Sequence, residues 1–236
     1  MRLLASMTLL VTIGALGCAN SSSDACLEGA SERGWTPPFG RALWCEKDNG
    51  ELHGRQMVWY RQGHLLVSAN FQGGQLHGRL LQRSRLGWRR REAHFSEGEL
   101  DGRVVRWLGK DRKVLEGHYQ AGLRDGSWAT WYQSGEPRGM DHYRAGRFHG
   151  DHREWSKSGV ILAEGTYQHG RPVGHWIWRD LDGKTLRTIT YASSALVTSY
   201  EDGVASGSTT LSDPDAIARA ENDSSLSTHS LRPELP

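Results

Sequence analysis

Cysteine, proline and an excess of one charge are all scarce in this chain of 236 residues. It has 3 cysteines, 7 prolines and a formal net charge of +2. The near-neutral balance argues against nucleic-acid binding, which needs a broad basic face. Zincin, phosphate-loop and nucleophile-elbow motifs are missing, and acidic residues do not recur beside histidines as acid/base pairs would. We therefore expect neither catalysis nor a cofactor.

The N-terminus has the pattern of a secretion signal. Arg2 precedes an apolar run from Leu3 to Leu16, which is too short to span a bilayer and ends at small residues. Ala15 to Cys18 resembles the lipobox of bacterial lipoproteins. The resemblance implies cleavage after residues 1–17, acylation of Cys18 and a membrane anchor, and the following alanine favours the outer membrane. Which side of that membrane the protein faces stays open, and a plain signal peptide is the alternative.

Export would place Cys26 and Cys45 in an oxidising compartment. Two cysteines with no other partner most often form a disulfide there, and closing this loop would stabilise the fold by roughly 3 kcal/mol. The loop between them holds two tryptophans and two prolines. We predict that residues 18–46 are a tether followed by a disulfide-closed N-terminal cap of irregular structure.

An aromatic residue recurs every 24 residues. Active sites seldom need the same residues at every step, so this period favours a scaffold over an enzyme. We predict six repeats over residues 47–190, with Lys47 in place of the first aromatic, a degenerate terminal repeat at 191–205 and a disordered Ser-rich tail at 206–236. The recurring aromatics are Phe71, Phe95, Tyr119, Tyr143, Tyr167 and Tyr191.

Glycines follow the same period, at places three, seven and sixteen after the aromatic. The first two should bracket a tight turn, and the third should form another turn, where Asp111 stands in one repeat. The intervening segments are short and rich in aromatic and β-branched residues, which is typical of strands. The sequence thus predicts an all-β, elongated antiparallel meander of β-hairpins, with two strands and roughly 9.6 Å per repeat. The first two glycine series are Gly74, Gly98, Gly122, Gly146 and Gly170, then Gly78, Gly102, Gly126, Gly150 and Gly174.

Tryptophans occur at two places in the repeat. Trp128 and Trp176 lie nine places after the aromatic, which is opposite in parity to the twelfth place on a straight strand. Either both faces of the sheet carry aromatics or a bulge lies between the two places. The tryptophans at the twelfth place are Trp59, Trp107, Trp131 and Trp155.

The motif Y-x-x-G-x-x-x-G-x-W-x-x-W resembles the variant MORN repeat of bacterial YwqK-type antitoxin-like proteins. The resemblance covers residues 47–203 and implies a β-hairpin array with an interaction role, but no activity. One full copy of the motif is carried by Tyr119, Gly122, Gly126, Trp128 and Trp131.

Histidines invite a metal assignment that the repeat makes unnecessary. His149, Asp151 and His152 lie within four residues, yet His152 takes the place held elsewhere by Trp128 and Trp176. A second histidine series steps by roughly 9.6 Å, beyond the reach of one shared ion. No metal site is predicted. The second series is His94, His118 and His142.

Arginines cluster at one turn, around Gly87 and Trp88. They are either a solvated hairpin turn or a contact for an anionic envelope component, since arginine pairs well with phosphate. Our main hypothesis is a non-catalytic, membrane-anchored scaffold that binds a protein or an envelope component; a carbohydrate-binding module and an antitoxin or immunity protein are the alternatives. The candidate binding surface is Trp59, Trp107, Trp128, Trp131, Trp155, Arg89, Arg90 and Arg91.

Overall fold

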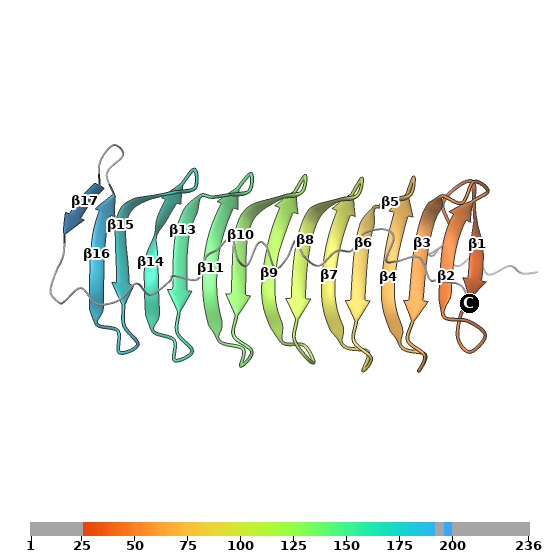
Figure 1. The fold of residues 1–236 in the computed structure, drawn as a ribbon, viewed down its shortest axis with the longest axis horizontal. Helices are drawn as coiled ribbons and strands as arrows, with labels where there is room; N and C mark the ends of the chain where they lie inside the picture. The colour runs from red at the N-terminus through yellow and green to blue at the C-terminus, as the bar shows by residue number, and fades with distance from the viewer. Residues whose placement is uncertain (1–25, 192–195, 200–236) are drawn as a thin grey trace, which may run out of the picture.

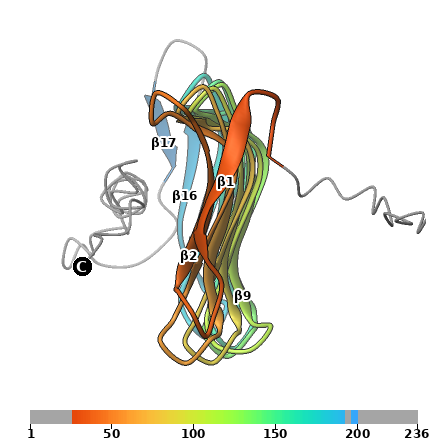
Figure 2. The ribbon, with the colours of Figure 1, turned by 90° about the vertical axis from the view of Figure 1, so that its right-hand side faces the viewer.

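The computed structural model describes residues 26–191 and 196–199, and these residues form one antiparallel sheet of 17 strands (Figure 1). Strands pair with their neighbours in chain order, so the sheet is a meander. Viewed along the long axis, they lie over one another in one layer (Figure 2). No helix in the described part of the chain is long and apolar enough to cross a membrane. The predicted all-β, elongated meander is confirmed.

Two strands come from each repeat, and β5 with β6, like β12 with β13, is one strand interrupted at a histidine. The predicted signal peptide, Cys18, the tether up to residue 25 and the tail at 206–236 lie outside the described residues. Within the terminal repeat, β17 still pairs with β16. The strands are β1 (Ala30–Trp35), β2 (Ala42–Lys47), β3 (Leu52–Trp59), β4 (Leu65–Gln72), β5 (Gln75–Leu76), β6 (Gly78–Arg83), β7 (Arg89–Ser96), β8 (Glu99–Trp107), β9 (Lys113–Gln120), β10 (Leu123–Trp131), β11 (Pro137–Arg144), β12 (Arg147–Phe148), β13 (Gly150–Trp155), β14 (Ile161–Gln168), β15 (Arg171–Arg179), β16 (Thr185–Tyr191) and β17 (Leu196–Ser199).

In the five repeats that begin with an aromatic, the first glycine lies in a two-residue hairpin turn. Glu97 and Gly98 have φ of 51° and 86°, and they connect the paired residues Ser96 and Glu99. Two successive positive φ values are the mark of a type I′ turn, whose twist matches that of the strands it joins. The same geometry recurs at residues 73–74, 121–122, 145–146 and 169–170.

The second glycine does not bracket that turn as predicted, but lies in or beside a break in the regular strand pairing. Around Gly102 the pairing shifts register between Ala93 and Phe95, and Gly102 has a φ of 110°. A Cβ at Gly102 would lie 3.0 Å from the Cβ of His94 on the neighbouring strand. The glycine is therefore needed for a bulge rather than for a turn.

A second bulge lies between the two tryptophan places of the repeat, the ninth and the twelfth, which was one of the two predicted alternatives. The pairing of β10 with β11 shifts register between Thr130 and Trp131, and matching shifts directly precede Trp59, Trp107 and Trp155. A bulge thus lies in each of these repeats just before the twelfth place. At the turns that follow, the third glycines have positive φ, and so does Asp111 at 55°, as predicted.

The N-terminal cap is a regular hairpin, not the predicted irregular segment. β1 pairs with β2 over their full length, and β2 continues the sheet by pairing with β3. The predicted disulfide between Cys26 and Cys45 is present. It packs against Gly54 of β3, where an added Cβ would lie 2.8 Å from the Cβ of Cys45. The cap therefore extends the array by two strands.

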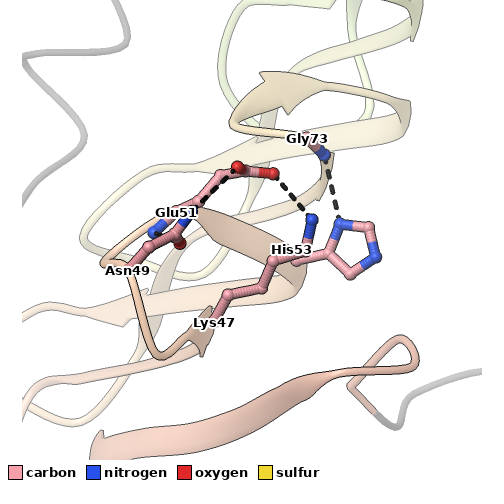
Figure 3. A network of polar contacts seen from close by, with 5 residues as sticks. All are labelled: Lys47, Asn49, Glu51, His53 and Gly73. Carbon is pink, nitrogen blue, oxygen red and sulfur yellow. Dashed lines mark hydrogen bonds and ion pairs between the residues drawn. The ribbon is translucent and has the colours of Figure 1, made fainter.

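Successive turns are tied together by a repeated backbone hydrogen bond. The amide of Gly74 donates to the carbonyl of Leu52, one repeat earlier, at 2.9 Å, and four later turn glycines do the same at 2.8–2.9 Å. At the first of these turns, the Gly73 amide also donates to Nδ1 of His53 at 3.1 Å (Figure 3). Lys47, which replaces the aromatic, donates to Glu51 there at 2.9 Å. The turns at this end of the strands are thus linked to one another from repeat to repeat.

Charged pairs recur on the sheet at the 24-residue step. Arg79 donates to Glu92 at 2.9 Å, and one repeat later Nε of Arg103 donates to Glu116 at 2.7 Å. Burial raises the pKa of Glu116, but hydrogen bonds from Lys113 and Arg103 outweigh this and hold the pKa below its usual range.

Replacing Gly122 by valine should lower the free energy of unfolding by about 1–2 kcal/mol, because a left-handed backbone conformation costs that much for a residue with a Cβ. The turn has room for the side chain, since a Cβ there would lie 3.5 Å from the nearest side-chain atom. Denaturant unfolding of Gly122→Val and of Gly122→Asn checks this. Asparagine tolerates the conformation, so an equal loss in both variants would contradict the backbone explanation.

Candidate functional site

Aromatic rings form a continuous series over the C-terminal half of one face of the sheet. From Tyr119 onward, each repeat aromatic touches a ring that lies between it and the next one, as Tyr119 touches Trp128 with ring centroids 5.1 Å apart. We call this side of the sheet the aromatic face. Its series, with centroid separations of 4.5–6.5 Å, is Tyr119, Trp128, Tyr143, Phe148, Tyr167, Trp176 and Tyr191.

The tryptophans of this series lie over glycines of the neighbouring strand. A Cβ at Gly117 would overlap the indole of Trp128, and one at Gly165 would overlap the indole of Trp176. Each indole also donates to a backbone carbonyl, Trp128 to His118 at 3.2 Å and Trp176 to Thr166 at 3.1 Å. Both rings are almost fully buried, at 3% exposure. The absence of a side chain at the glycines is what allows this packing.

One repeat replaces the tryptophan–glycine pair by a hydrogen-bonded histidine and aspartate. His152 stands in the tryptophan place and Asp141 in the glycine place, with Nδ1 of the imidazole 2.6 Å from Oδ1 of the carboxylate. The imidazole stacks on Trp176, with ring centroids 5.4 Å apart and planes at 25°. Both side chains are half-buried. This repeat therefore presents polar groups where its neighbours present indole.

A groove of about 280 Å³ opens on the aromatic face around this pair. It lies where the position four residues before the repeat aromatic is small, at Gly139 and Ala163. In earlier repeats the same position holds the buried Val67 and Leu115 and the half-buried Arg91. Side chains of the groove come from β9 to β16. Those used below are Arg124, Trp128, Arg138, Gly139, Asp141, Tyr143, His152, Glu154, Ala163, Tyr167, Trp176 and Trp178.

The charges in the groove balance. Arg124 lies over the rings of Trp128 and Tyr143, at 4.3 and 5.2 Å, and donates to the tyrosine hydroxyl at 3.0 Å. Arg138 is half-buried, and so is Glu154, whose strand neighbours are Gly139 and Ala163. Within the described part of the chain, Glu154 has no ion pair. Two guanidinium groups and two carboxylates therefore line an aromatic groove with no net formal charge.

Burial raises the pKa of Tyr167, and the negative charge of Asp141 adds to the effect, followed by Tyr191. Its phenol is thus held in the neutral, hydrogen-bonding form. His149, considered with His152 for a metal, instead contacts the ring of His169 at 5.2 Å. Among residues 26–191 and 196–199, no three His, Cys, Asp or Glu side chains gather as metal ligands would.

The predicted binding residues divide between several places. Only Trp128 of the five tryptophans lines the groove. Three others lie under a cation: Trp107 under Arg89 at 4.6 Å, Trp131 under Lys113 at 5.3 Å, and Trp155 under Arg153 at 5.9 Å. Trp59 is half-buried; Arg89 and Arg90 are exposed and Arg91 is half-buried.

Sequence reasoning missed the residues that make the groove distinctive. His152 and Glu154 were not placed in a site, and Trp178 was not singled out. One signal in the sequence could have found them. Gly139 and Ala163 are small, although the aromatic residues around them keep the 24-residue period. Small side chains at one position of a closely packed repeat leave a hollow there.

Replacing Gly165 by alanine should lower the free energy of unfolding by about 1–3 kcal/mol, as overpacking of a filled site does. The added methyl overlaps the ring of Trp176. Gly139→Ala is the matched control, because its methyl meets the rotatable hydroxyl of Thr130 at 3.0 Å and, at an ordinary contact distance of 3.9 Å, the carbonyl oxygen of Arg153. Thermal unfolding of both variants checks this, and equal losses would contradict the packing of Trp176 over Gly165.

Comparison with known families supports the interpretation of the repeat. Residues 148–169 match the family model described as a MORN repeat variant. This segment includes β13 and carries Phe148, His152, Glu154 and Ala163 of the groove. A search of curated proteins finds no match to the chain. The matched segment is one step of the 24-residue period that the structure repeats, and the chain is therefore a repeat protein built on a MORN-variant unit.

Proposed function

We propose that the protein is a non-catalytic, exported lipoprotein that acts as a binding scaffold for an envelope component or another protein. A MORN-variant repeat array suggests a repeat-based binding protein. The observation that carries the proposal is the aromatic groove, a concave and largely apolar site with a few polar groups, which is the usual form of a ligand site. Acylation at Cys18 would anchor the scaffold to the membrane, by the lipobox resemblance.

The turns at the other ends of the strands, opposite the type I′ turns, support an envelope component as the partner. Arg85 and Arg90 are exposed there and have no ion pair among the residues that the structure describes. Arg89 pairs with Asp111 at 3.4 Å, but both are exposed, and such pairs contribute little. Arg61 and Lys110 are exposed in the turns β3–β4 and β8–β9. These turns lie on the same side of the sheet as the turn β6–β7 (Figure 1). These cations suit contact with anionic envelope groups.

Fractionation of cells with mass analysis of the protein's N-terminus tests the anchor. We expect a chain that begins at acylated Cys18 in the outer-membrane fraction, because the lipobox resemblance implies cleavage and lipid attachment at that residue. Cys18→Ser is the matched control and should release the protein from the membrane fraction, since several acyl chains are needed for stable attachment. An intact Met1 on a cytosolic protein would overturn export, anchoring and the envelope scaffold together.

A further inference from the structure

We infer that the groove binds a linear, uncharged polysaccharide that lies along the long axis of the array. The inference rests on the proposed envelope function and names the ligand class of the same groove. Three observations carry it: the accessible rings, the period at which they recur and the balance of charge between them.

The rings that remain accessible are suited to the apolar face of a sugar. Trp128 and Trp176 are almost fully buried and form the frame of the groove. Trp178 and Tyr167 are half-buried and line it. Trp178 stacks on Trp176 with ring centroids 5.6 Å apart and planes at 24°, and the Arg187 guanidinium lies 5.3 Å from the Trp178 ring centroid; these two contacts fix its orientation. A flat ring held in place in this way offers contact area at little cost in side-chain entropy.

The spacing of the rings matches a repeating polymer. Tyr167 and Tyr191 line the groove, are half-buried and come from the alternate strands β14 and β16, with β15 between them. Tyr143 of β11 continues the same period but is buried, at 8% exposure. Each step of two strands advances roughly 9.6 Å, which is about the length of two linked pyranose rings. An extended, β-linked glycan can therefore meet successive tyrosines with equivalent sugar faces. The groove runs along the direction in which this period repeats.

The polar groups favour an uncharged ligand. Arg124 and Arg138 balance Asp141 and Glu154, so the lining does not attract a polyanion or a polycation. The Glu154 carboxylate lies beside the small residues Gly139 and Ala163 and has no ion pair in the described ranges. A carboxylate has two acceptor oxygens and a guanidinium group has five N–H donors, and both can therefore bind pairs of neighbouring hydroxyls. The polar groups thus complement a glycan between the aromatic contacts.

Calorimetric titration of the full chain, purified in detergent, with fully N-acetylated chitohexaose and with cellohexaose tests the inference. We expect at least one of these extended oligosaccharides to bind and α-linked maltohexaose, which coils, to bind more weakly. Trp178→Ala removes a ring, and Ala163→Leu fills the groove with the side chain that Leu115 carries one repeat pair earlier. Each should weaken binding by at least about tenfold, or about 1.4 kcal/mol.

Trp88→Ala is the matched control, because Trp88 is 38% exposed and lies at the arginine-rich turn away from the groove. Its affinity for the oligosaccharide should equal that of the unaltered chain. Thermal unfolding of all variants shows whether they are folded. Oligosaccharide binding that survives both groove variants in folded protein would overturn the assignment of the site.

Two further outcomes would overturn the inference while leaving the scaffold intact. Binding of tetramethylammonium that is lost in Glu154→Gln would identify a cation site walled by aromatic rings instead. An outer-membrane protein with acylated Cys18 that binds neither oligosaccharide would reject the glycan but not the envelope scaffold. Failure of the proposed function has a different signature, an unacylated protein in the cytosol.

Discussion

A sheet of one layer has to cover both of its faces with its own side chains, and every other feature of this protein follows from that constraint. On the aromatic face, rings from successive repeats touch in series, and glycines beneath Trp128 and Trp176 let the indoles lie close to the sheet. Elsewhere, arginine and glutamate side chains such as those of Arg103 and Glu116 form ion pairs that recur with the repeat. Stability is therefore built between neighbours, with few contacts beyond the adjacent repeat.

The period of 24 residues was sufficient to predict two strands per repeat, their antiparallel order and the turn at the third glycine, where Asp111 replaces glycine in one repeat. Sequence could not assign the second glycine correctly, because a type I′ turn and a bulge both require positive φ and select the same residue. The cap was misjudged for a related reason. Besides β1, β2 pairs with β3. Because β3 lies in the first repeat, the sequence of the cap alone does not show that the cap continues the sheet.

The groove was harder to predict, since it arises from what two residues lack. Gly139 and Ala163 carry no distinctive chemistry, and the hollow they leave is visible only once neighbouring strands are in register. Asp141 and His152 are eleven residues apart and meet only across that pairing. The parity of the tryptophans was likewise undetermined, because the bulge that separates Thr130 from Trp131 depends on the partner strand. Repetition thus predicts the frame, while departures from repetition make the site.

The number of repeats before the groove sets its distance from the N-terminal end of the array. The strands β3 to β8 of the first three repeats separate the disulfide-closed end from the first strand of the groove, β9. For a chain held at its N-terminal end, these repeats are a rigid spacer, and each additional pair of strands carries the groove roughly 9.6 Å farther from the point of attachment. Duplication or loss of one 24-residue segment therefore changes the reach of the molecule without altering any contact inside the groove.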